Sequence, residues 1–182
     1  GSAGWGGGVA TGRGCGRAFG ALGGARRGGA RGVAVGGSSG DAWGERMSST
    51  GASVTITQDE RGRKGAKIPR KRTADGAIKL APSIEKVVVV RRTGGEVPFE
   101  VGRDLWWHEL VGGESTDCEP EHCNAEDILY LLHTSGTTAK PKAAQHTTGG
   151  YLTYVSCTHK WIFDIHDDDV GWCAAHVGWV PG

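Results

Sequence analysis

The sequence predicts an α/β fold built on a parallel sheet, because strongly apolar strands alternate with helical patterns along the chain. Residues 84–92, IEKVVVVRR, are rich in β-branched side chains and follow a proline and a serine. Residues 127–136, DILYLLHTSG, form a second apolar run that ends in turn residues. Such runs are typical of strands covered on both faces, as in a parallel sheet.

Shorter elements fill the intervals around these two strands. Residues 53–59 alternate in polarity and predict a short strand, and residues 73–81 predict a short helix after a basic loop. Large side chains recur at helical rather than alternating spacing in residues 101–113 and predict a helix there. Apolar residues at three- and four-residue spacing predict an amphipathic helix over residues 147–163, and residues 169–180 predict a strand and turn.

Residues 1–50 differ from the rest of the chain, because glycine, alanine and arginine dominate and no helical or strand period survives. A glycine-rich segment loses much backbone entropy on ordering and has few large side chains to bury. We therefore expect residues 1–50 to be disordered and residues 51–182 to form an incomplete domain. The preferred interpretation of residues 1–50 is a linker or non-native coding sequence; a transit peptide and an RNA-binding Arg-Gly tract are the alternatives.

Composition narrows the functional classes. The 182 residues include 21 basic and 20 acidic side chains, so no strong overall attraction to nucleic acid or membrane is expected. Five irregularly spaced cysteines without a CxxC pair are typical of a reducing compartment. No apolar run reaches the roughly 18 residues of a membrane span. We expect a soluble, cytoplasmic protein, with a mitochondrial or plastid location as the alternative.

Residues 131–150, LLHTSGTTAKPKAAQHTTGG, change abruptly from a strand to a polar, positively charged loop. Gly136 lets the backbone turn so that N–H groups converge on an anion, and Lys140 and Lys142 add charge on either side of Pro141. Hydroxyl donors come from Thr134, Ser135, Thr137 and Thr138. The GxxxxGK[ST] pattern is absent, so this is not a Walker A loop. These residues alone leave a phosphate-binding loop and a solvated turn equally open.

The stretch LLHTSGTTAKPKAAQHTTGGYL resembles the phosphate-loop signature of the adenylate-forming enzymes. The blocks GRDLWWHEL, NAED, HTTGGYL, FDIH and DVGWC narrow the resemblance to the acetyl-CoA synthetases, the AMP-forming acetate–CoA ligases. Upstream, TQDERGRKGAKIPRK and PSIEKVVVVRRTGG resemble the preceding segments of that family in the same order. The resemblance covers about residues 53–182.

This resemblance implies part of the large N-terminal parallel-sheet domain of an adenylate-forming enzyme. The implied reaction has two steps, in which ATP and acetate form acetyl-AMP and pyrophosphate, and CoA then takes the acetyl group. The implied substrates and cofactors are acetate, ATP, CoA and Mg²⁺, with the Mg²⁺ ligands outside this chain. The resemblance implies neither a membrane partner nor a nucleic-acid partner, and it leaves the oligomeric state open.

The resemblance assigns roles to individual residues. The ATP phosphate loop comprises Thr134, Ser135, Gly136, Thr137, Thr138 and Lys142. Arg63 matches an arginine at the nucleotide end of CoA, with Lys64 beside it. Pro181 stands where the family approaches CoA, and Val180 where it lines the acyl pocket. The catalytic lysine of the family has no counterpart before Gly182, so no catalytic residue is assigned and the 182-residue chain is expected to be inactive alone.

Several residues depart from the family pattern. Ala139 and Ala143 replace glycines of the phosphate loop, and a positive φ at either position would cost alanine about 1 kcal/mol. His133 replaces a tyrosine, His176 an aspartate and Pro181 a threonine. Full activity is therefore not expected even of a completed chain.

Three other interpretations stay open. The first is a synthetase for another short-chain acid such as propionate. The second is a nucleotide- or RNA-binding module that uses the basic run at residues 61–72. The third is a non-enzymatic remnant or an incomplete gene product. No metal site is expected, because the four adjacent residues 166–169 favour a solvated turn over a shared ion.

Overall fold

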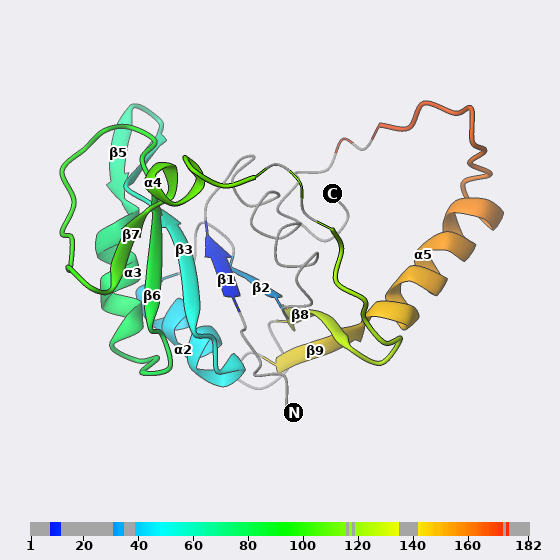
Figure 1. Cartoon of the computed structure of the whole chain (residues 1–182), viewed down its shortest axis with the longest axis horizontal. Helices are drawn as coiled ribbons and strands as arrows, with labels where there is room; N and C mark the ends of the chain where they lie inside the picture. The colour runs from blue at the N-terminus through cyan, green and yellow to red at the C-terminus, as the bar shows by residue number, and fades with distance from the viewer. Residues whose placement is uncertain are drawn as a thin grey trace.

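The computed structural model of the chain describes residues 8–11, 31–34, 39–115, 117, 119–134, 142–172 and 174. Among these residues, seven strands form one sheet in the order β7-β6-β3-β1-β2-β8-β9 (Figure 1). The β8–β9 pair is antiparallel and the other neighbours are parallel. The strands are β1 (Gly8–Thr11), β2 (Arg31–Ala34), β3 (Val54–Gln58), β6 (Lys86–Val90), β7 (Asp104–Trp106), β8 (Ile128–Thr134) and β9 (Lys142–Thr147).

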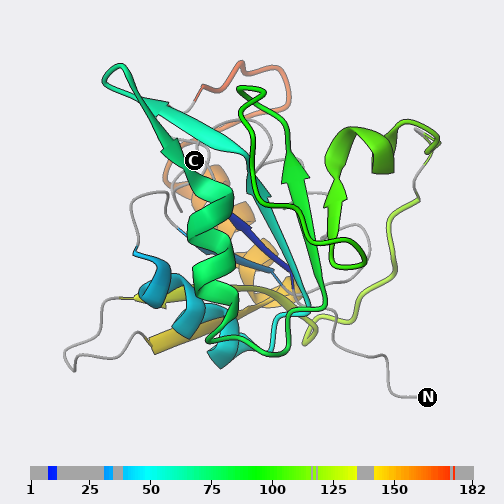
Figure 2. The same cartoon turned by 90° about the vertical axis from the view of Figure 1, so that its left-hand side faces the viewer.

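Helices and one hairpin complete the described fold. Helices α2 and α3 lie side by side on one face of the sheet, and the hairpin extends from the end of β3 (Figure 2). The hairpin is β4 (Glu60–Arg63) and β5 (Ala66–Pro69), and the helices are α2 (Gly40–Thr50), α3 (Arg70–Ile78), α4 (Trp107–Val111) and α5 (Thr148–Trp161). No helix within the described ranges is long and apolar enough to cross a membrane.

The hydrophobic core lies between this pair of helices and the strands β3 and β6. Large side chains from α2 pack against small ones from α3 and β-branched ones from β6; the buried members include Trp43, Met47, Ala74, Ala77, Val87 and Val89. The helices approach closely at Gly44, where an added Cβ would lie 2.6 Å from the Ala77 carbonyl oxygen. Glycine at this position therefore permits the crossing that buries both helices.

Helix α2 corrects the expectation that residues 1–50 lack regular structure. The Ser39 hydroxyl accepts a hydrogen bond from the Ala42 N–H and caps the helix start, and Gly51 ends it at φ 59°. Trp43 and Met47, which lie one helical turn apart, are buried, so a short amphipathic pattern was missed. Apart from β1, β2 and residues 39–50, the N-terminal prediction lies outside the described residues.

Four other predicted elements are confirmed at nearly the expected residues. Strands β3, β6 and β8 lie within residues 53–59, 84–92 and 127–136, and helix α5 lies within residues 147–163. Parallel pairing of β6 with β3 confirms the predicted parallel sheet. Helix α5, however, has no buried residue among those described, and it extends away from the sheet in Figure 1.

Non-local contacts explain the elements that were predicted wrongly. The helix expected over residues 101–113 begins as strand β7, because Asp104–Trp106 pair with β6, and only Trp107–Val111 are helical. Helix α3 begins at Arg70 rather than Thr73, since the Asp59 carbonyl accepts the Arg70 and Lys71 N–H groups at 3.0 and 3.1 Å.

Two further corrections concern the C-terminal half of the chain. Strand β9 was not expected, and it forms by pairing with β8. Residues 169–172 are not a strand, and Val170 and Trp172 are 100% and 89% exposed. The remainder of the strand predicted at 169–180 lies outside the described residues, apart from Ala174.

Candidate functional site

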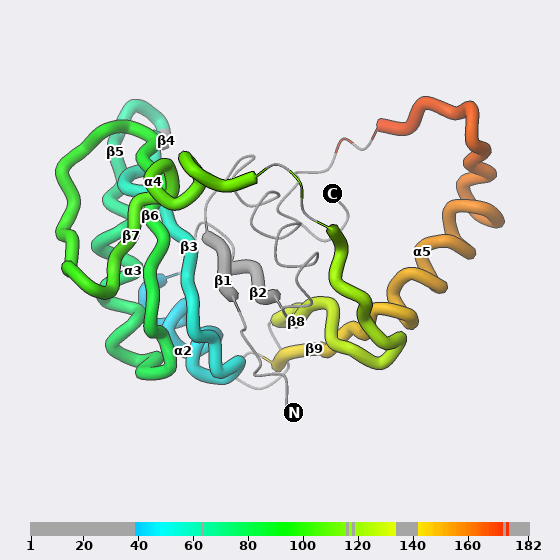
Figure 3. The backbone as a smooth tube through the Cα atoms, viewed as in Figure 1, coloured from blue at the N-terminus to red at the C-terminus, as the bar shows by residue number. Residues whose placement is uncertain are grey.

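The parallel strands end at one common edge of the sheet, here called the carboxyl edge. Strands β1 and β3 are neighbours in the sheet. The strand after β1, β2, lies on one side of this pair, and β6 lies beside β3 on the other side. The strand order therefore reverses between β1 and β3. In open α/β sheets, ligands bind beyond the carboxyl ends of the strands at such a reversal. The β4–β5 hairpin follows β3 at this edge, and β8 ends there at Thr134; Figure 3 traces the backbone of these elements.

The ends of the predicted phosphate loop are paired across the β8–β9 ladder. Thr134 is the partner of Lys142, and His133 is the partner of Ala143. Opposite residues in an antiparallel pair have Cα atoms about 5 Å apart, so the loop leaves and returns at one point of the carboxyl edge. Ser135, Gly136, Thr137 and Thr138 lie outside the described residues, as does the Thr134 side chain.

Aromatic packing supports the strand pair that carries this loop. The rings of Tyr130 and His146 stack at 4.5 Å with an interplanar angle of 11°, and Tyr151 meets Tyr130 edge-on at 5.3 Å. Burial raises the pKa of Tyr130, with a further contribution from Tyr151. These contacts join β8, β9 and the first turn of α5, and they fix the register in which Thr134 meets Lys142.

Two of the sequence blocks behind the resemblance, NAED and HTTGG, contact each other in the structure. The Thr148 N–H donates to the Asp127 carbonyl at 2.8 Å, and the Gly149 N–H donates to the Ala125 carbonyl at 2.9 Å. A Cβ at Gly149 would lie 2.6 Å from the Ala125 Cβ, so the contact requires glycine. The Thr147 side chain caps α5 by accepting the Gly150 N–H. These contacts hold the start of α5 against the segment that leads into β8.

His133 lies directly before the loop and departs from the family tyrosine. Burial lowers the pKa of His133, and the positive charge of Arg46 lowers it further. The imidazole is therefore neutral at physiological pH, and it adds no positive charge beside the loop.

The hairpin presents the predicted CoA residues at its tip. Arg63 pairs with Ala66 across the turn, and Lys64 and Gly65 have φ values of 50° and 80°, as in a type I′ turn. The Lys64 side chain is exposed, and the Arg63 side chain lies outside the described residues. A lysine in the left-handed region is uncommon.

The basic run at residues 61–72 does not form one exposed surface. Arg61, Arg70 and Lys71 are all buried. The Arg70 guanidinium lies 5.7 Å from the Trp43 ring centroid, and burial lowers the pKa of Arg70, as does the charge of Arg61. Three of the seven basic residues in the run are therefore part of the fold, which weighs against the nucleic-acid interpretation.

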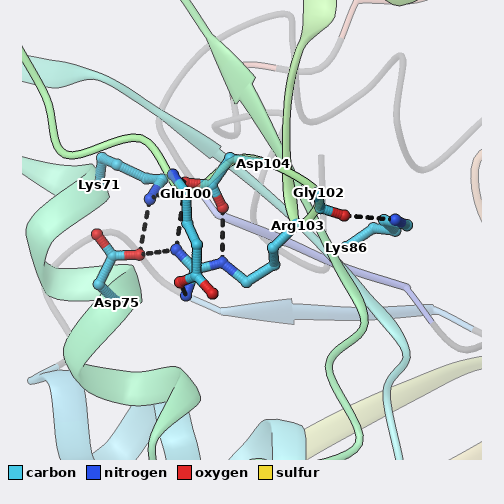
Figure 4. Close-up of polar contacts among 7 residues, drawn as sticks. All are labelled: Lys71, Asp75, Lys86, Glu100, Gly102, Arg103 and Asp104. Carbon is cyan, nitrogen blue, oxygen red and sulfur yellow. Dashed lines mark hydrogen bonds and ion pairs between the residues drawn. The ribbon is translucent and has the colours of Figure 1, made fainter.

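A buried ionic network holds α3 against β7 (Figure 4). The Lys71 Nζ lies 2.7 Å from both Asp75 Oδ1 and Asp104 Oδ2, and the Lys71 and Asp104 side chains are fully buried. The Arg103 Nε lies 2.7 Å from Asp104 Oδ1, and its Nη2 lies 2.7 Å from Asp75 Oδ1. Two carboxylates thus share two cations, and each charge has a partner, as burial requires.

The pKa values of Asp104 and Arg103 reflect this pairing. Burial alone would raise the pKa of Asp104, but hydrogen bonds from Arg103 and Lys71 outweigh it and leave that pKa below its ordinary value. The hydrogen bond to Asp104 raises the pKa of Arg103 in spite of burial. Both groups are therefore charged at neutral pH.

No group of three or more His, Cys, Asp or Glu side chains able to hold a metal ion occurs within the described part of the chain. Residues 166–169 form the expected turn, in which the Asp169 N–H donates to the His166 carbonyl at 3.1 Å. The Asp169 carboxylate in turn accepts the His166 N–H at 2.8 Å, so it serves the turn itself.

Comparison with known proteins identifies the family. The family described as AMP-binding enzyme matches residues 10–182. The chain belongs to the AMP-binding enzyme family. The match begins before residue 53 and includes part of the glycine-rich segment.

Curated relatives narrow the comparison within the AMP-binding family. An acetyl-coenzyme A synthetase from Rubrobacter xylanophilus is 53% identical over 138 residues, which cover 76% of this chain and 21% of the relative. One from Desulfatibacillum aliphaticivorans is 49% identical over 143 residues, which cover 78% of this chain and 22% of the relative. The chain therefore spans about one fifth of the length of these relatives.

A solved structure supports the fold. The acetoacetyl-CoA synthetase from Streptomyces lividans matches 96% of this chain and 27% of its own, with a TM-score of 0.80 and 22% sequence identity. The predicted fold class, part of the parallel-sheet domain of an adenylate-forming enzyme, is confirmed. The roles predicted for Arg63, Lys64, Val180 and Pro181 stay predictions, and the last two residues lie outside the described part.

The Asp104→Asn substitution is expected to destabilise the chain by about 3 kcal/mol at neutral pH, because Lys71 and Arg103 lose a shared buried carboxylate. The folded pKa of Asp104 lies below its ordinary value of 3.8, so its carboxylate stabilises the fold above that value. The contribution disappears as the pH falls through the folded pKa. Urea denaturation from pH 7 down to pH 3 measures the difference between the two proteins.

Asp168→Asn is the matched control, because Asp168 is an exposed acid in the 166–169 turn. This variant is expected to unfold at the same urea concentration as the natural chain. An Asp104→Asn variant as stable as the control at pH 7, or a difference that does not shrink on acidification, contradicts the proposed network.

Proposed function

We propose that this chain is part of an AMP-forming acetate–CoA ligase. The observation that carries the proposal is the pairing of Thr134 with Lys142 at the carboxyl edge, in a chain about half identical to acetyl-coenzyme A synthetases. The proposed ligase joins acetate to ATP, releases pyrophosphate, and then transfers the acetyl group from acetyl-AMP to the thiol of CoA. It is proposed to be cytoplasmic.

The first step needs stabilisation of phosphate charge. Acetate is a poor acyl donor because its oxygen leaves badly, and adenylation converts that oxygen into a good leaving group. Attack on the α-phosphate places negative charge on the departing pyrophosphate, which fixed N–H, hydroxyl and ammonium groups stabilise. We assign this role to the loop residues Thr134, Ser135, Gly136, Thr137 and Thr138, with Lys142 as the cation.

The paired loop ends favour this assignment. Donors that are fixed before the reaction stabilise developing charge without a cost of reorganisation. The register of β8 and β9 brings the two ends together, and the Tyr130–His146 stack supports that register. A bound Mg²⁺ would neutralise further phosphate charge, and its ligands are proposed to lie outside this chain. Lys142 is exposed, so ATP can reach it from the carboxyl edge.

The second step needs a site for CoA, and we assign the hairpin tip to it. Arg63 and Lys64 lie at the end of β4 and in the turn, where they would face a phosphorylated ribose. Pro181 is proposed to approach CoA, and Val180 to line the acyl pocket. Burial of Arg61, Arg70 and Lys71 makes CoA a better fit than nucleic acid for the remaining exposed charge.

Lys142→Ala in the whole ligase is expected to lower acetate-dependent pyrophosphate release from ATP by about 100-fold, because one charged phosphate contact is lost. Thr137→Ala is expected to act in the same direction. Gln145→Ala, an exposed residue of the same strand, is the matched control and should retain the full rate. Unchanged pyrophosphate release in Lys142→Ala and Thr137→Ala would refute the phosphate-loop assignment.

Lys64→Asn should separate stability from CoA binding. Asparagine tolerates the left-handed conformation better than lysine, so the free energy of unfolding is expected to rise by a few tenths of a kcal/mol. Loss of the charge is expected to raise the KM for CoA by about fivefold, as for one exposed ion pair of about 1 kcal/mol. Urea denaturation and steady-state kinetics measure the two effects, and the remote Lys79→Asn serves as the control. A KM for CoA that stays constant shows that Lys64 does not contact CoA.

A further inference from the structure

Asp59 lies at the junction between β3 and the β4–β5 hairpin, and its side chain is fully buried. Its Oδ1 accepts the N–H groups of Glu60 at 2.6 Å and Arg92 at 3.0 Å. Its Oδ2 accepts the N–H groups of Thr93 at 3.0 Å and Gly94 at 2.9 Å. One carboxylate therefore joins the start of β4 to the turn that follows β6.

The backbone of Asp59 joins two further elements. Its N–H donates to the Val90 carbonyl at 3.0 Å, and its own carbonyl accepts the Arg70 and Lys71 N–H groups at the start of α3. The hairpin begins at Glu60 and ends at Pro69, and these two residues are register partners. Asp59 thus holds both ends of the hairpin, the entering strand through residue 60 and the leaving strand through residue 70.

The neighbouring Glu60 strengthens the same junction. Its Oε2 accepts the Thr93 hydroxyl at 2.8 Å and lies 3.7 Å from the Lys67 Nζ on β5. The Glu60 carboxylate lies over Gly95, where an added Cβ would meet it. The turn at residues 92–95 therefore packs against the two successive acids at the base of the hairpin.

The hairpin projects from this base toward a tip that carries Arg63 and Lys64 (Figure 2). Three residues of strand separate base and tip, about 10 Å at 3.4 Å per residue. A rotation of about 10° at the base would move the tip by about 2 Å, and misplacement of about 1 Å can cost 100-fold in rate. The geometry at the base therefore decides where the two basic residues lie.

We propose that Asp59 is a positioning residue for CoA binding, because it sets the direction of the hairpin that presents Arg63 and Lys64. This inference rests on the proposed function, since it assigns CoA to the hairpin tip. Asp59 is too deeply buried to touch CoA, so it acts through the hairpin. The chemistry of ATP and acetate takes place at another segment, the loop between β8 and β9, and does not depend on Asp59.

Asp59→Asn in the whole ligase tests the proposal. The substitution keeps the shape of the side chain but turns one acceptor into an N–H₂ group facing backbone N–H donors. The KM for CoA is expected to rise about tenfold or more, while acetate-dependent ATP–pyrophosphate exchange, which needs no CoA, stays within about twofold. Hydrogen–deuterium exchange of residues 61–68 is expected to become faster.

Val87→Ala, which removes core packing in β6, is the control for a general loss of stability. It should leave the KM for CoA and hairpin exchange unchanged. The inference is overturned if Asp59→Asn leaves the KM for CoA unchanged, or if Val87→Ala raises it equally. If Asp59→Asn does not fold, Thr93→Val removes only the hydroxyl contacts to Asp59 and Glu60, and an unchanged KM for CoA in that variant also overturns the inference.

Failure of the proposed function gives a different result. In that case the natural ligase forms no acetyl-CoA, and neither pyrophosphate exchange nor a KM for CoA is measurable. Hydrogen exchange at residues 61–68 then tests only the structural claim, that Asp59 sets the direction of the hairpin. Faster exchange in Asp59→Asn but not in Val87→Ala supports the role of Asp59 in setting the hairpin, and equal exchange in both variants contradicts it.

Discussion

Parallel pairing of the strands is the constraint on which the arrangement of this chain depends. Because β3 and β8 run in the same direction as β1 and β2 between them, the segments that follow them leave from one edge. The hairpin and the phosphate-loop candidate, about 70 residues apart in sequence, therefore share the carboxyl edge of the sheet. The proposed function uses this juxtaposition, because it transfers an acetyl group from an adenylate to a thiol.

Buried polar groups determine how the hairpin and the elements around it are held. Asp59 satisfies four backbone N–H groups with its side chain, and Lys71 and Asp104 satisfy each other in the core. Such groups are costly to bury unless they are paired, so they specify one arrangement of strands and helices. Small residues allow neighbouring segments to approach closely, as at Gly44 and Gly149. Arg61, Arg70 and Lys71 of the basic run are thus part of the fold.

Local pattern predicted the elements whose side chains carry a clear period, namely β3, β6, β8 and α5. It could not predict β7 or β9, because both depend on pairing with a strand far away or across a loop, and α2 was hidden by its glycine-rich surroundings. The hydroxyl, glycine and lysine content of residues 134–142 left a phosphate loop and a solvated turn equally open, and the resemblance favoured the phosphate loop. Asp59 carried no comparable signal, since only the folded chain brings residues 92–94 to its carboxylate.

Hydrogen–deuterium exchange of the proposed whole ligase with each ligand tests the shared carboxyl edge most directly. ATP with acetate is predicted to slow exchange in residues 134–142, and CoA is predicted to slow exchange in residues 60–69. Slower exchange confined to segments away from this edge, such as the C-terminal half of α5, would contradict the account.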